Sequence, residues 1–317
     1  MPELIKNITV LMPAYNCAKY IGQSIKSILN QTYKDFEFII IDDGSTDNTE
    51  EIVRNFKDPR IIYKKTENKG TSAALNYGLS IANNEWVARI DADDLNVPSR
   101  LEKQVKFLNE NPGYDIVSSW SVYFKDPDKI LFLLREPVEH DDIYEHLDLH
   151  NMLNQSGLIC QKKIILDAGY NENYRNNEDF ELFYRIRDKV KFYNIPEFLV
   201  YTRVRSGSKT NTNNNHNIYD FLFNPSFKNM IDAKSKGEHF YWATTIAWIN
   251  YFFGSRRESR SYFKNSFSWK NQLAYIATFL PDKYFNIFIN SHLKYRLKTL
   301  FSATGGYKKE LRDLNTK

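Results

Sequence analysis

The stretch Glu85–Asp94 (E-W-V-A-R-I-D-A-D-D) places three carboxylates within four positions after an apolar run. Residues 86–90 carry the apolar and β-forming side chains that are typical of a buried strand. Asp91, Asp93 and Asp94 follow at the carboxyl end of this strand, the edge at which open α/β sheets bind ligands. Carboxylates this close repel one another unless a cation lies among them, and their oxygen atoms suit a hard ion such as Mg²⁺ or Mn²⁺. The alternative is a solvated acidic turn that caps the next helix.

The preceding segments alternate between two hydrophobic periods. Ile8–Met12 and Phe36–Ile41 are apolar, as expected of central parallel strands, whereas Tyr20–Leu29 repeats apolar residues at helical spacing. The full predicted order is strands at 8–12, 36–41, 60–64 and 86–90, with helices at 20–29, 48–56 and 72–82 between them. This βαβ pattern predicts an α/β fold with a doubly wound, mostly parallel sheet flanked by helices.

Length and composition are those of a globular protein. The 317 residues, 42% of them hydrophobic and 26% charged, can form one good core and a second, smaller one. Cys17 and Cys160 are too few for a disulfide framework and show no metal-ligand spacing, so a reducing cytoplasm is expected. Met1–Asn7 is polar and leads into a strand, which argues against a signal peptide. No apolar run approaches the ~20 residues that span a bilayer.

Charged and aromatic residues are unevenly distributed. The formal net charge is +4, but Ser235–Lys317 holds 14 Lys and Arg against 5 Asp and Glu, which leaves −5 on the first 234 residues. Aromatic side chains gather in the same basic tail. Basic residues beside aromatics suit an anionic membrane surface, although a helical subdomain packed on the core or a dimer interface fits equally well. Nucleic acid is a weaker alternative because no recognition motif accompanies the charge.

Two polar loops follow neighbouring strands at the same predicted edge as the three carboxylates. Pro13–Asn16 follows the first strand and Asp42–Ser45 follows the second. The ring of Tyr15 can stack on a base, and the carboxylate of Asp43 can accept a hydrogen bond from a base or a ribose. The alternatives are a packed tyrosine and a helix-capping aspartate. Since the chain has neither G-x-G-x-x-G nor a P-loop motif, a metal would have to neutralise any bound diphosphate.

Further segments follow one another along about two thirds of the chain. They are V-L-M-P-A-Y-N (10–16), I-I-I-D-D-G-S-T-D (39–47), N-K-G-T-S-A-A-L-N-Y-G (68–78), A-R-I-D-A-D-D-L-N-V-P-S-R (88–100), P-S-R-L-E-K-Q (98–104), Gly157–Tyr170 and N-E-D-F-E-L-F (177–183). In this order they resemble the motifs of family 2 glycosyltransferases with the GT-A fold, of the type that builds bacterial surface polysaccharides. The resemblance implies transfer of a sugar from a nucleotide diphosphate donor to an acceptor hydroxyl, with inversion at the anomeric carbon.

The resemblance also implies a role for each matching residue. It puts the general base at Asp179, with Glu178 orienting it or contacting the acceptor, and a divalent ion at Asp93 and Asp91, with Asp94 in support. It puts the donor on Pro13, Ala14, Tyr15, Asn16, Asp43, Asn68, Lys69, Asp91 and Ala92, and the departure from the family pattern described below adds Arg203 and Arg205. The chemistry agrees, because a metal stabilises the charge that develops on the leaving diphosphate and a carboxylate must deprotonate the weakly nucleophilic hydroxyl. Acids are also common in the first turn of a helix for dipole reasons alone.

The sequence departs from the family pattern at two places. Where relatives often carry N-x-x-x-H, this chain has Asn151 followed by Gln155, and the R-x-H near the end of the domain is here Arg203-Val204-Arg205. A histidine at the second place could ligate the metal, whereas Arg205 could instead pair with donor phosphates. The identity of a third metal ligand is therefore open. The alternative for this segment is a basic, mobile loop, in keeping with the polar run at 210–217.

These observations predict a metal-dependent, inverting glycosyltransferase with a GT-A domain at 1–217 and a helical, basic, aromatic-rich region at 218–317. By resemblance, the donor is a UDP-sugar, the transferred group is a hexosyl or N-acetylhexosaminyl unit, and the acceptor is a lipid-linked or growing surface oligosaccharide. The expected location is the cytoplasm, against the inner face of the plasma membrane, and a homodimer is compatible with the tail. Two alternatives from other classes are a nucleotidyltransferase, which would release pyrophosphate, and a catalytically silent nucleotide-sugar-binding scaffold.

Overall fold

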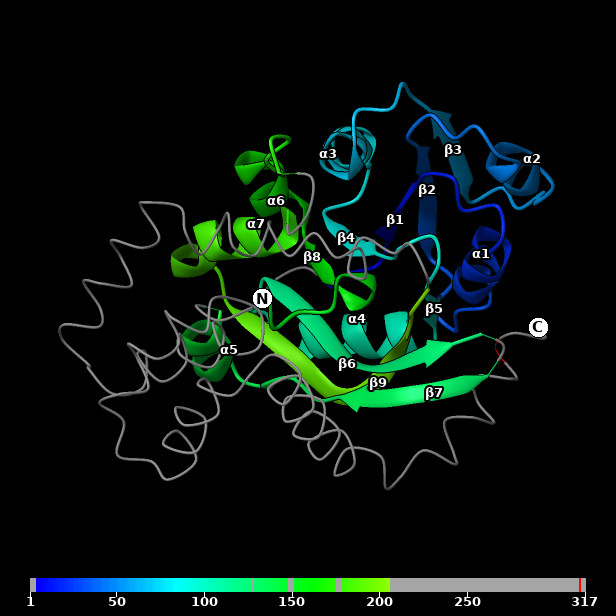
Figure 1. The fold of residues 1–317 in the computed structure, drawn as a ribbon. Coiled ribbons are helices and arrows are strands. Elements are labelled where there is room, and N and C mark those ends of the chain that lie inside the picture. The colour runs from blue at the N-terminus through cyan, green and yellow to red at the C-terminus, as the bar shows by residue number, and fades with distance from the viewer. Residues whose placement is uncertain (1–3, 127, 148–150, 175–177, 206–313, 315–317) are drawn as a thin grey trace, which may run out of the picture. The chain divides into compact units, whose positions relative to one another are not determined.

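The computed structural model describes residues 4–126, 128–147, 151–174, 178–205 and 314 (Figure 1). In these ranges the chain is organised around one nine-stranded sheet. The predicted loop at 210–217 and, apart from residue 314, the predicted helical region at 218–317 lie outside the described residues. No helix in the described ranges is long and apolar enough to cross a bilayer.

The N-terminal part of the chain forms the parallel part of the sheet. Its strands pair in the order β3 (Ile61–Lys65), β2 (Phe36–Asp42), β1 (Ile8–Ala14) and β4 (Trp86–Arg89). The connecting helices are α1 (Ile21–Leu29), α2 (Thr49–Arg54) and α3 (Thr71–Ile81). All the strands and helices predicted for this part are present, and their ends agree within two residues. The prediction succeeded because strands covered by helices on both faces are apolar throughout.

Beyond β4 the sheet is mixed. β8 (Ile159–Gln161) runs antiparallel to β4 and leads to β6 (Ile116–Lys125), which pairs in parallel with β9 (Phe192–Arg203). The other elements of this part are β5 (Leu95–Asn96), β7 (Lys129–Leu134), α4 (Arg100–Glu110), α5 (His140–His146), α6 (Lys162–Ala168) and α7 (Glu178–Ile186), with the short 3₁₀ turns η1 (Gln155–Gly157) and η2 (Arg187–Lys189). The expected α/β architecture is thus present, with an antiparallel extension that the sequence pattern did not specify.

Apolar clusters pack on both faces of the sheet. Val10 on β1 packs with residues of α1 and α4, whereas its neighbour Leu11 belongs to a second cluster with residues of α3 and α7. Because β1, β2 and β4 are parallel and in register, their carboxyl ends meet at one edge. This edge carries the loops that follow Ala14, Asp42 and Arg89.

Candidate active site

The three carboxylates that follow β4 lie in different surroundings. The side chain of Asp91 is 37% exposed and that of Asp93 is 19% exposed, whereas Asp94 is buried. Burial and the charge of Asp91 raise the pKa of Asp93, and Arg205 opposes this shift. Burial and the charges of Asp93 and Asp91 raise the pKa of Asp94 well above its ordinary value. Crowding of this kind favours a cation between the exposed carboxylates.

Asp94 fixes the turn on which the other two carboxylates stand. Its Oδ2 accepts a hydrogen bond from Ser156 Oγ at 2.6 Å, and its Oδ1 accepts one from the backbone N–H of Arg203 at 2.7 Å. The backbone N–H of Asp91 donates to the same Ser156 oxygen at 3.0 Å. Asp94 therefore joins the turn to η1 and to the end of β9.

Two arginines at the end of β9 contact Asp93. Arg205, whose side chain is 31% exposed, donates from Nε to Asp93 Oδ2 at 2.6 Å. Arg203 is buried and donates from Nε to the Asp93 carbonyl at 2.7 Å and from a terminal nitrogen to Gln23 at 2.8 Å, and it also pairs with Asp126. The guanidinium of Arg203 thus holds the backbone of the turn at Asp93, whereas that of Arg205 contacts the Asp93 carboxylate.

Asp43 organises the start of α3. Its two carboxylate oxygens accept hydrogen bonds from the backbone N–H groups of Lys69 and Gly70, each at 2.8 Å. The approach depends on Gly44, whose φ is +74° and whose missing Cβ would lie 2.8 Å from the backbone nitrogen of Asn68. Asp43, Asn68 and Lys69 therefore form one structural unit, with the last two exposed.

The loop after β1 is tied to the loop after β2. Asn16, at φ +46°, accepts a hydrogen bond from the backbone N–H of Thr46 at 2.8 Å and donates its own N–H to Ser45 Oγ at 2.9 Å. Tyr15 beside it is 49% exposed, so its ring is not packed in the core. The remaining residues predicted to contact the donor are half-buried or buried: Pro13, Ala14 and Ala92.

The acids predicted to perform base catalysis begin α7, and their environments differ. Asp179 is partly exposed, and its Oδ2 accepts a hydrogen bond from the side-chain amide of Asn151 at 2.7 Å. Its Oδ1 accepts from the backbone N–H of Phe180 at 2.8 Å. Glu178 is 9% exposed. The amide of Asn151, itself part of the segment that departs from the family pattern, thus fixes the orientation of the Asp179 carboxylate.

Sequence reasoning did not single out Arg89, the last residue of β4. Its buried guanidinium donates to Asp91 Oδ1 at 3.0 Å and to Gln155 Oε1. Burial lowers the pKa of Arg89, but the charge of Asp91, followed by Tyr170 and the two acids that begin α7, raises it above its ordinary value. The charge of Arg89 thus interacts with Asp91, which follows β4, and with the acids that begin α7. The signal in the sequence that could have identified Arg89 is a charged residue at the end of an apolar strand.

The resemblance implies a divalent metal beside these carboxylates. Among the described residues, no three His, Cys, Asp or Glu side chains gather as a metal site. Asp91 and Asp93 nonetheless offer partly exposed oxygen ligands whose negative charges are crowded. Mg²⁺ is commonly held by one or two carboxylates, with water and substrate phosphates completing its shell. The pair therefore fits a hard divalent cation that is shared with a diphosphate.

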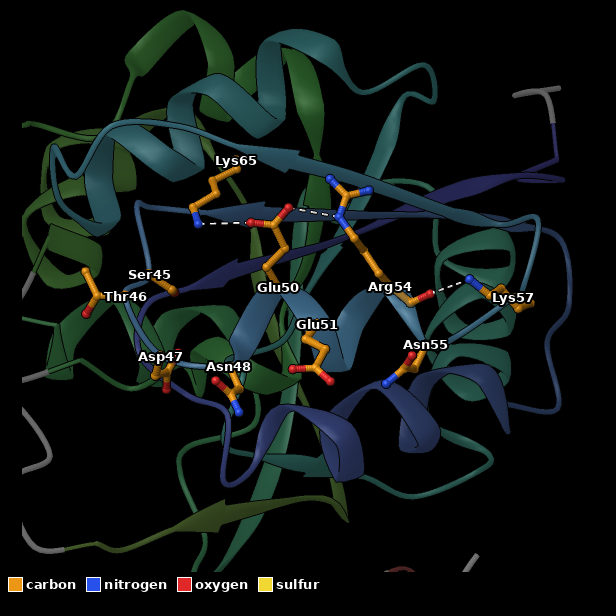
Figure 2. A pocket seen from close by; sticks show the side chains of 10 residues that line it. All are labelled: Ser45, Thr46, Asp47, Asn48, Glu50, Glu51, Arg54, Asn55, Lys57 and Lys65. Atoms are coloured by element: carbon orange, nitrogen blue, oxygen red, sulfur yellow. Dashed lines mark hydrogen bonds and ion pairs between the residues drawn. The ribbon is translucent and has the colours of Figure 1, made fainter.

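A surface hollow of ≈ 560 Å³ lies beside α2 (Figure 2). Figure 2 shows Glu50 between Lys65 and Arg54, with ion-pair distances of 3.0 and 2.9 Å. The hollow is lined by residues 45–48 and by side chains of α2 and its flanks, and none of the acids that follow β4 or begin α7 contributes to it. It is therefore separate from the carboxylate cluster.

Comparisons of sequence place this site within a known family of enzymes. Residues 9–196 match the family model described as glycosyl transferase family 2. An uncharacterized glycosyltransferase of Methanocaldococcus jannaschii is 36% identical over 213 residues, 62% of this chain and 70% of the relative. The Escherichia coli protein WfaP, a UDP-Glc:alpha-D-GlcNAc-diphosphoundecaprenol beta-1,3-glucosyltransferase, is 32% identical over 208 residues, 63% of this chain and 78% of WfaP.

Solved structures support the same fold. TarS 1-349 of S. aureus, solved in complex with UDP-GlcNAc, has a TM-score of 0.54 and 17% identity, and the match covers 98% of this chain and 90% of TarS 1-349. The mannosyltransferase PcManGT from Pyrobaculum calidifontis, solved with GDP-Man and Mn²⁺, has a TM-score of 0.55 and 18% identity, and the match covers 97% of this chain and 84% of PcManGT. The mixed, helix-flanked sheet of this chain is thus the GT-A fold of these glycosyltransferases.

Proposed function

This chain belongs to glycosyl transferase family 2, and we propose that it moves a sugar from a nucleotide diphosphate donor to an acceptor hydroxyl, with inversion and in a metal-dependent reaction. The observation that carries the proposal is the hydrogen bond from Arg89 to Asp91 at the end of β4, together with the electrostatic interaction of the same guanidinium with Glu178 and Asp179 at the start of α7. One group of acids is suited to a diphosphate and its cation, and the other is suited to proton transfer.

We infer that the donor is a UDP-sugar bound over the carboxyl ends of β1 and β2. The exposed ring of Tyr15 is available to stack on the base, and Asp43, which holds Lys69, donates its backbone N–H to the carbonyl of Ala14, the residue before Tyr15, at 2.8 Å. The similarity to WfaP, whose name specifies UDP-Glc, supports uridine over other bases. Transfer of a hexosyl or N-acetylhexosaminyl group is the corresponding proposal for the sugar.

Asp91, Asp93 and Arg205 are proposed to receive the diphosphate. A divalent cation bound by the two carboxylates would supply Lewis-acid stabilisation of the leaving group. Arg205 already contacts Asp93 through Nε at 2.6 Å, so its guanidinium can pair with a phosphate oxygen after only a local rearrangement. Asp94 and Arg203 keep the turn in place, because both are buried and hydrogen-bonded within the protein.

Asp179 is proposed as the general base. Its Oδ2 accepts a hydrogen bond from Asn151, which fixes the carboxylate orientation while the side chain remains partly exposed. The carboxylate would take the proton of the acceptor hydroxyl as that oxygen attacks the anomeric carbon from the face opposite the leaving diphosphate. Because a single displacement needs no covalent enzyme intermediate, no second nucleophile is required. Glu178 is proposed to orient Asp179 or to contact the acceptor.

We propose a lipid-linked or growing surface oligosaccharide as the acceptor, which would bring the enzyme to the inner face of the plasma membrane. The similarity to WfaP supports this class, because its name specifies a sugar carried on diphosphoundecaprenol. The basic, aromatic-rich segment at 218–317 is the proposed contact with the membrane surface, with packing on the core or dimerisation as the alternative roles.

A donor panel tests the proposal. Wild type and Asp179→Asn are incubated with UDP-, GDP- and dTDP-sugars, Mn²⁺ and diphosphoundecaprenol-linked acceptors, and nucleotide products and glycosylated lipid are quantified. We expect nucleoside diphosphate and glycosylated product in equal amounts from the wild type, and a product whose anomeric configuration is inverted. Release of pyrophosphate would identify a nucleotidyltransferase. Nucleotide binding without turnover of any donor, or equal turnover by Asp179→Asn, would contradict the proposed catalysis.

A further inference from the structure

The guanidinium of Arg89 is held by partners from two separate parts of the chain. One terminal nitrogen donates to Asp91 Oδ1 at 3.0 Å, and the other donates to Gln155 Oε1 in η1. The backbone of Arg89 is fixed as well, since its N–H donates to the Leu158 carbonyl at 2.8 Å. The side chain of Arg89 thus connects the carboxylate of Asp91 to the segment that carries η1.

This arrangement is costly as a device for stability alone. The side chain of Arg89 is 6% exposed, and its Nε is buried with no hydrogen-bond partner among the described residues. Removing a guanidinium from water is energetically costly, an ion pair offsets this cost only in part, and an apolar side chain of similar size would often pack in the core as well. The presence of a buried cation at this position therefore points to a task that requires its charge and its hydrogen bonds.

Arg100 provides an internal comparison. It is also fully buried, but among the described residues it donates only to the carbonyl oxygens of Arg89 and Ser156, at 3.0 and 2.8 Å. Burial lowers its pKa to about 9. Arg100 thus donates to the backbone around the site, whereas Arg89 contacts the carboxylate of Asp91 directly.

The neighbours of Arg89 complete a frame around Asp91. Gln155 accepts from Arg89, and the next residue, Ser156, accepts the backbone N–H of Asp91 at 3.0 Å and donates to Asp94 at 2.6 Å. The side chain of Asp91 is therefore oriented by Arg89 while its backbone is oriented by Ser156. The Asp91 side chain nonetheless remains 37% exposed.

We propose that Arg89 is a positioning residue that orients Asp91 for the donor diphosphate and couples this carboxylate to η1 through Gln155. The inference rests on the proposed function, which it deepens. A residue that orients a metal- or phosphate-binding carboxylate typically changes affinity or activity by 10–100-fold when it is replaced. Replacing Arg89 should therefore weaken binding and use of the donor nucleotide sugar rather than prevent folding.

Arg89→Lys tests this role because it keeps the positive charge but cannot donate simultaneously in the two directions that the guanidinium fork serves. We expect kcat/KM for the donor nucleotide sugar to fall about 10–100-fold, with a matching rise in the Kd of the nucleoside diphosphate. Arg60→Lys is the matched control, since Arg60 is a half-buried arginine paired with Asp58 away from the site. The kcat/KM of Arg60→Lys should stay at the wild-type value, even if its Tm falls as much as that of Arg89→Lys.

A double-mutant cycle separates positioning from general destabilisation. If Arg89 acts through Asp91, adding Arg89→Lys to Asp91→Asn should reduce kcat/KM or nucleotide affinity less than about threefold further, since the two changes remove one interaction. The same cycle with Gln155→Met measures the coupling to η1. The inference would be overturned if Arg89→Lys reduced kcat/KM by the same factor in the wild type and in Asp91→Asn. It would also be overturned if kcat fell only in proportion to the folded fraction while KM and Kd were unchanged. A wild type that neither binds nor uses nucleotide sugars would instead contradict the proposed function and, with it, this role.

Discussion

Arg205 donates a hydrogen bond from Nε to Oδ2 of Asp93 at 2.6 Å, so a fixed cation stands at the carboxylate proposed to hold the metal. This pairing occurs where the family pattern carries a histidine, and it opposes the rise that burial and Asp91 cause in the pKa of Asp93. A guanidinium at this point can pair with Asp93 when no diphosphate is bound and with the diphosphate when the donor is bound.

Removing this guanidinium should weaken donor binding. We predict that Arg205→Ala raises the Kd of UDP about tenfold or more, because one charge-assisted contact to a phosphate contributes on the order of 1.5–3 kcal/mol. Arg205→Lys should recover part of the affinity, since it restores the charge without the fork. Isothermal titration calorimetry at constant Mn²⁺ measures both variants. Unchanged UDP affinity in Arg205→Ala would mean that the side chain serves only Asp93.

Asp179→Asn should separate catalysis from donor binding. We predict that turnover falls by about 10²–10⁴-fold, the usual contribution of a general base, while the Kd of UDP stays within about twofold of wild type. The hydrogen bond from Asn151 can be retained, because the substituted amide still has an acceptor oxygen. Asp167→Asn, which changes a surface carboxylate that is 63% exposed, is the control. Steady-state kinetics with near-wild-type turnover by Asp179→Asn would exclude this carboxylate as the base.

Gly44→Ala should disturb the loop that presents Asn68 and Lys69. An alanine at φ +74° is strained by about 1–2 kcal/mol, and its Cβ would lie 2.8 Å from the Asn68 backbone nitrogen. We predict a loss of about 1–3 kcal/mol in the free energy of unfolding, together with weaker UDP binding. Gly113→Ala, where an added Cβ meets no atom within 4 Å, is the matched control. Equal urea midpoints for the two variants would contradict the account of this turn.

The two cysteines should be unreactive in the folded protein. Burial raises the pKa of Cys17 to about 12, partly opposed by a hydrogen bond with Thr49, and burial also raises the pKa of Cys160 to about 12. Because only the thiolate reacts, alkylation by iodoacetamide at pH 8 should be at least about 100-fold slower in the native than in the urea-unfolded protein, with the native rate rising as pH approaches 12. Mass spectrometry measures each site. Rapid native labelling of Cys17 would show that the loop after β1 opens.

The sequence predicted the first half of the fold well because its information is local. Apolar strands and amphipathic helices alternate up to Asp91, and the predicted elements of this half were confirmed. The family suggested by the successive motifs was confirmed by the match over residues 9–196. The antiparallel strand β8 was not predicted, since its three residues carry too little pattern to distinguish pairing direction.

The candidate site was harder to predict because its support comes from distant parts of the chain. Arg203 was expected to hold diphosphate, which stays a prediction, and its guanidinium contacts the Asp93 carbonyl, Gln23 and Asp126, contacts that no sequence spacing reveals. Arg89 was overlooked because its partner Gln155 lies 66 positions away. The proposed roles of the donor-binding and catalytic residues stay predictions until they are measured.

Calorimetric titration of UDP into wild type and Asp93→Asn, each with and without Mn²⁺, tests the central claim most directly. The account predicts that tight UDP binding requires both the metal and Asp93, because the carboxylate and the diphosphate share one cation. GDP and dTDP, titrated in parallel, should bind more weakly. UDP binding that is equally tight without metal, or in Asp93→Asn, would contradict the claim, as would the absence of binding by any nucleoside diphosphate.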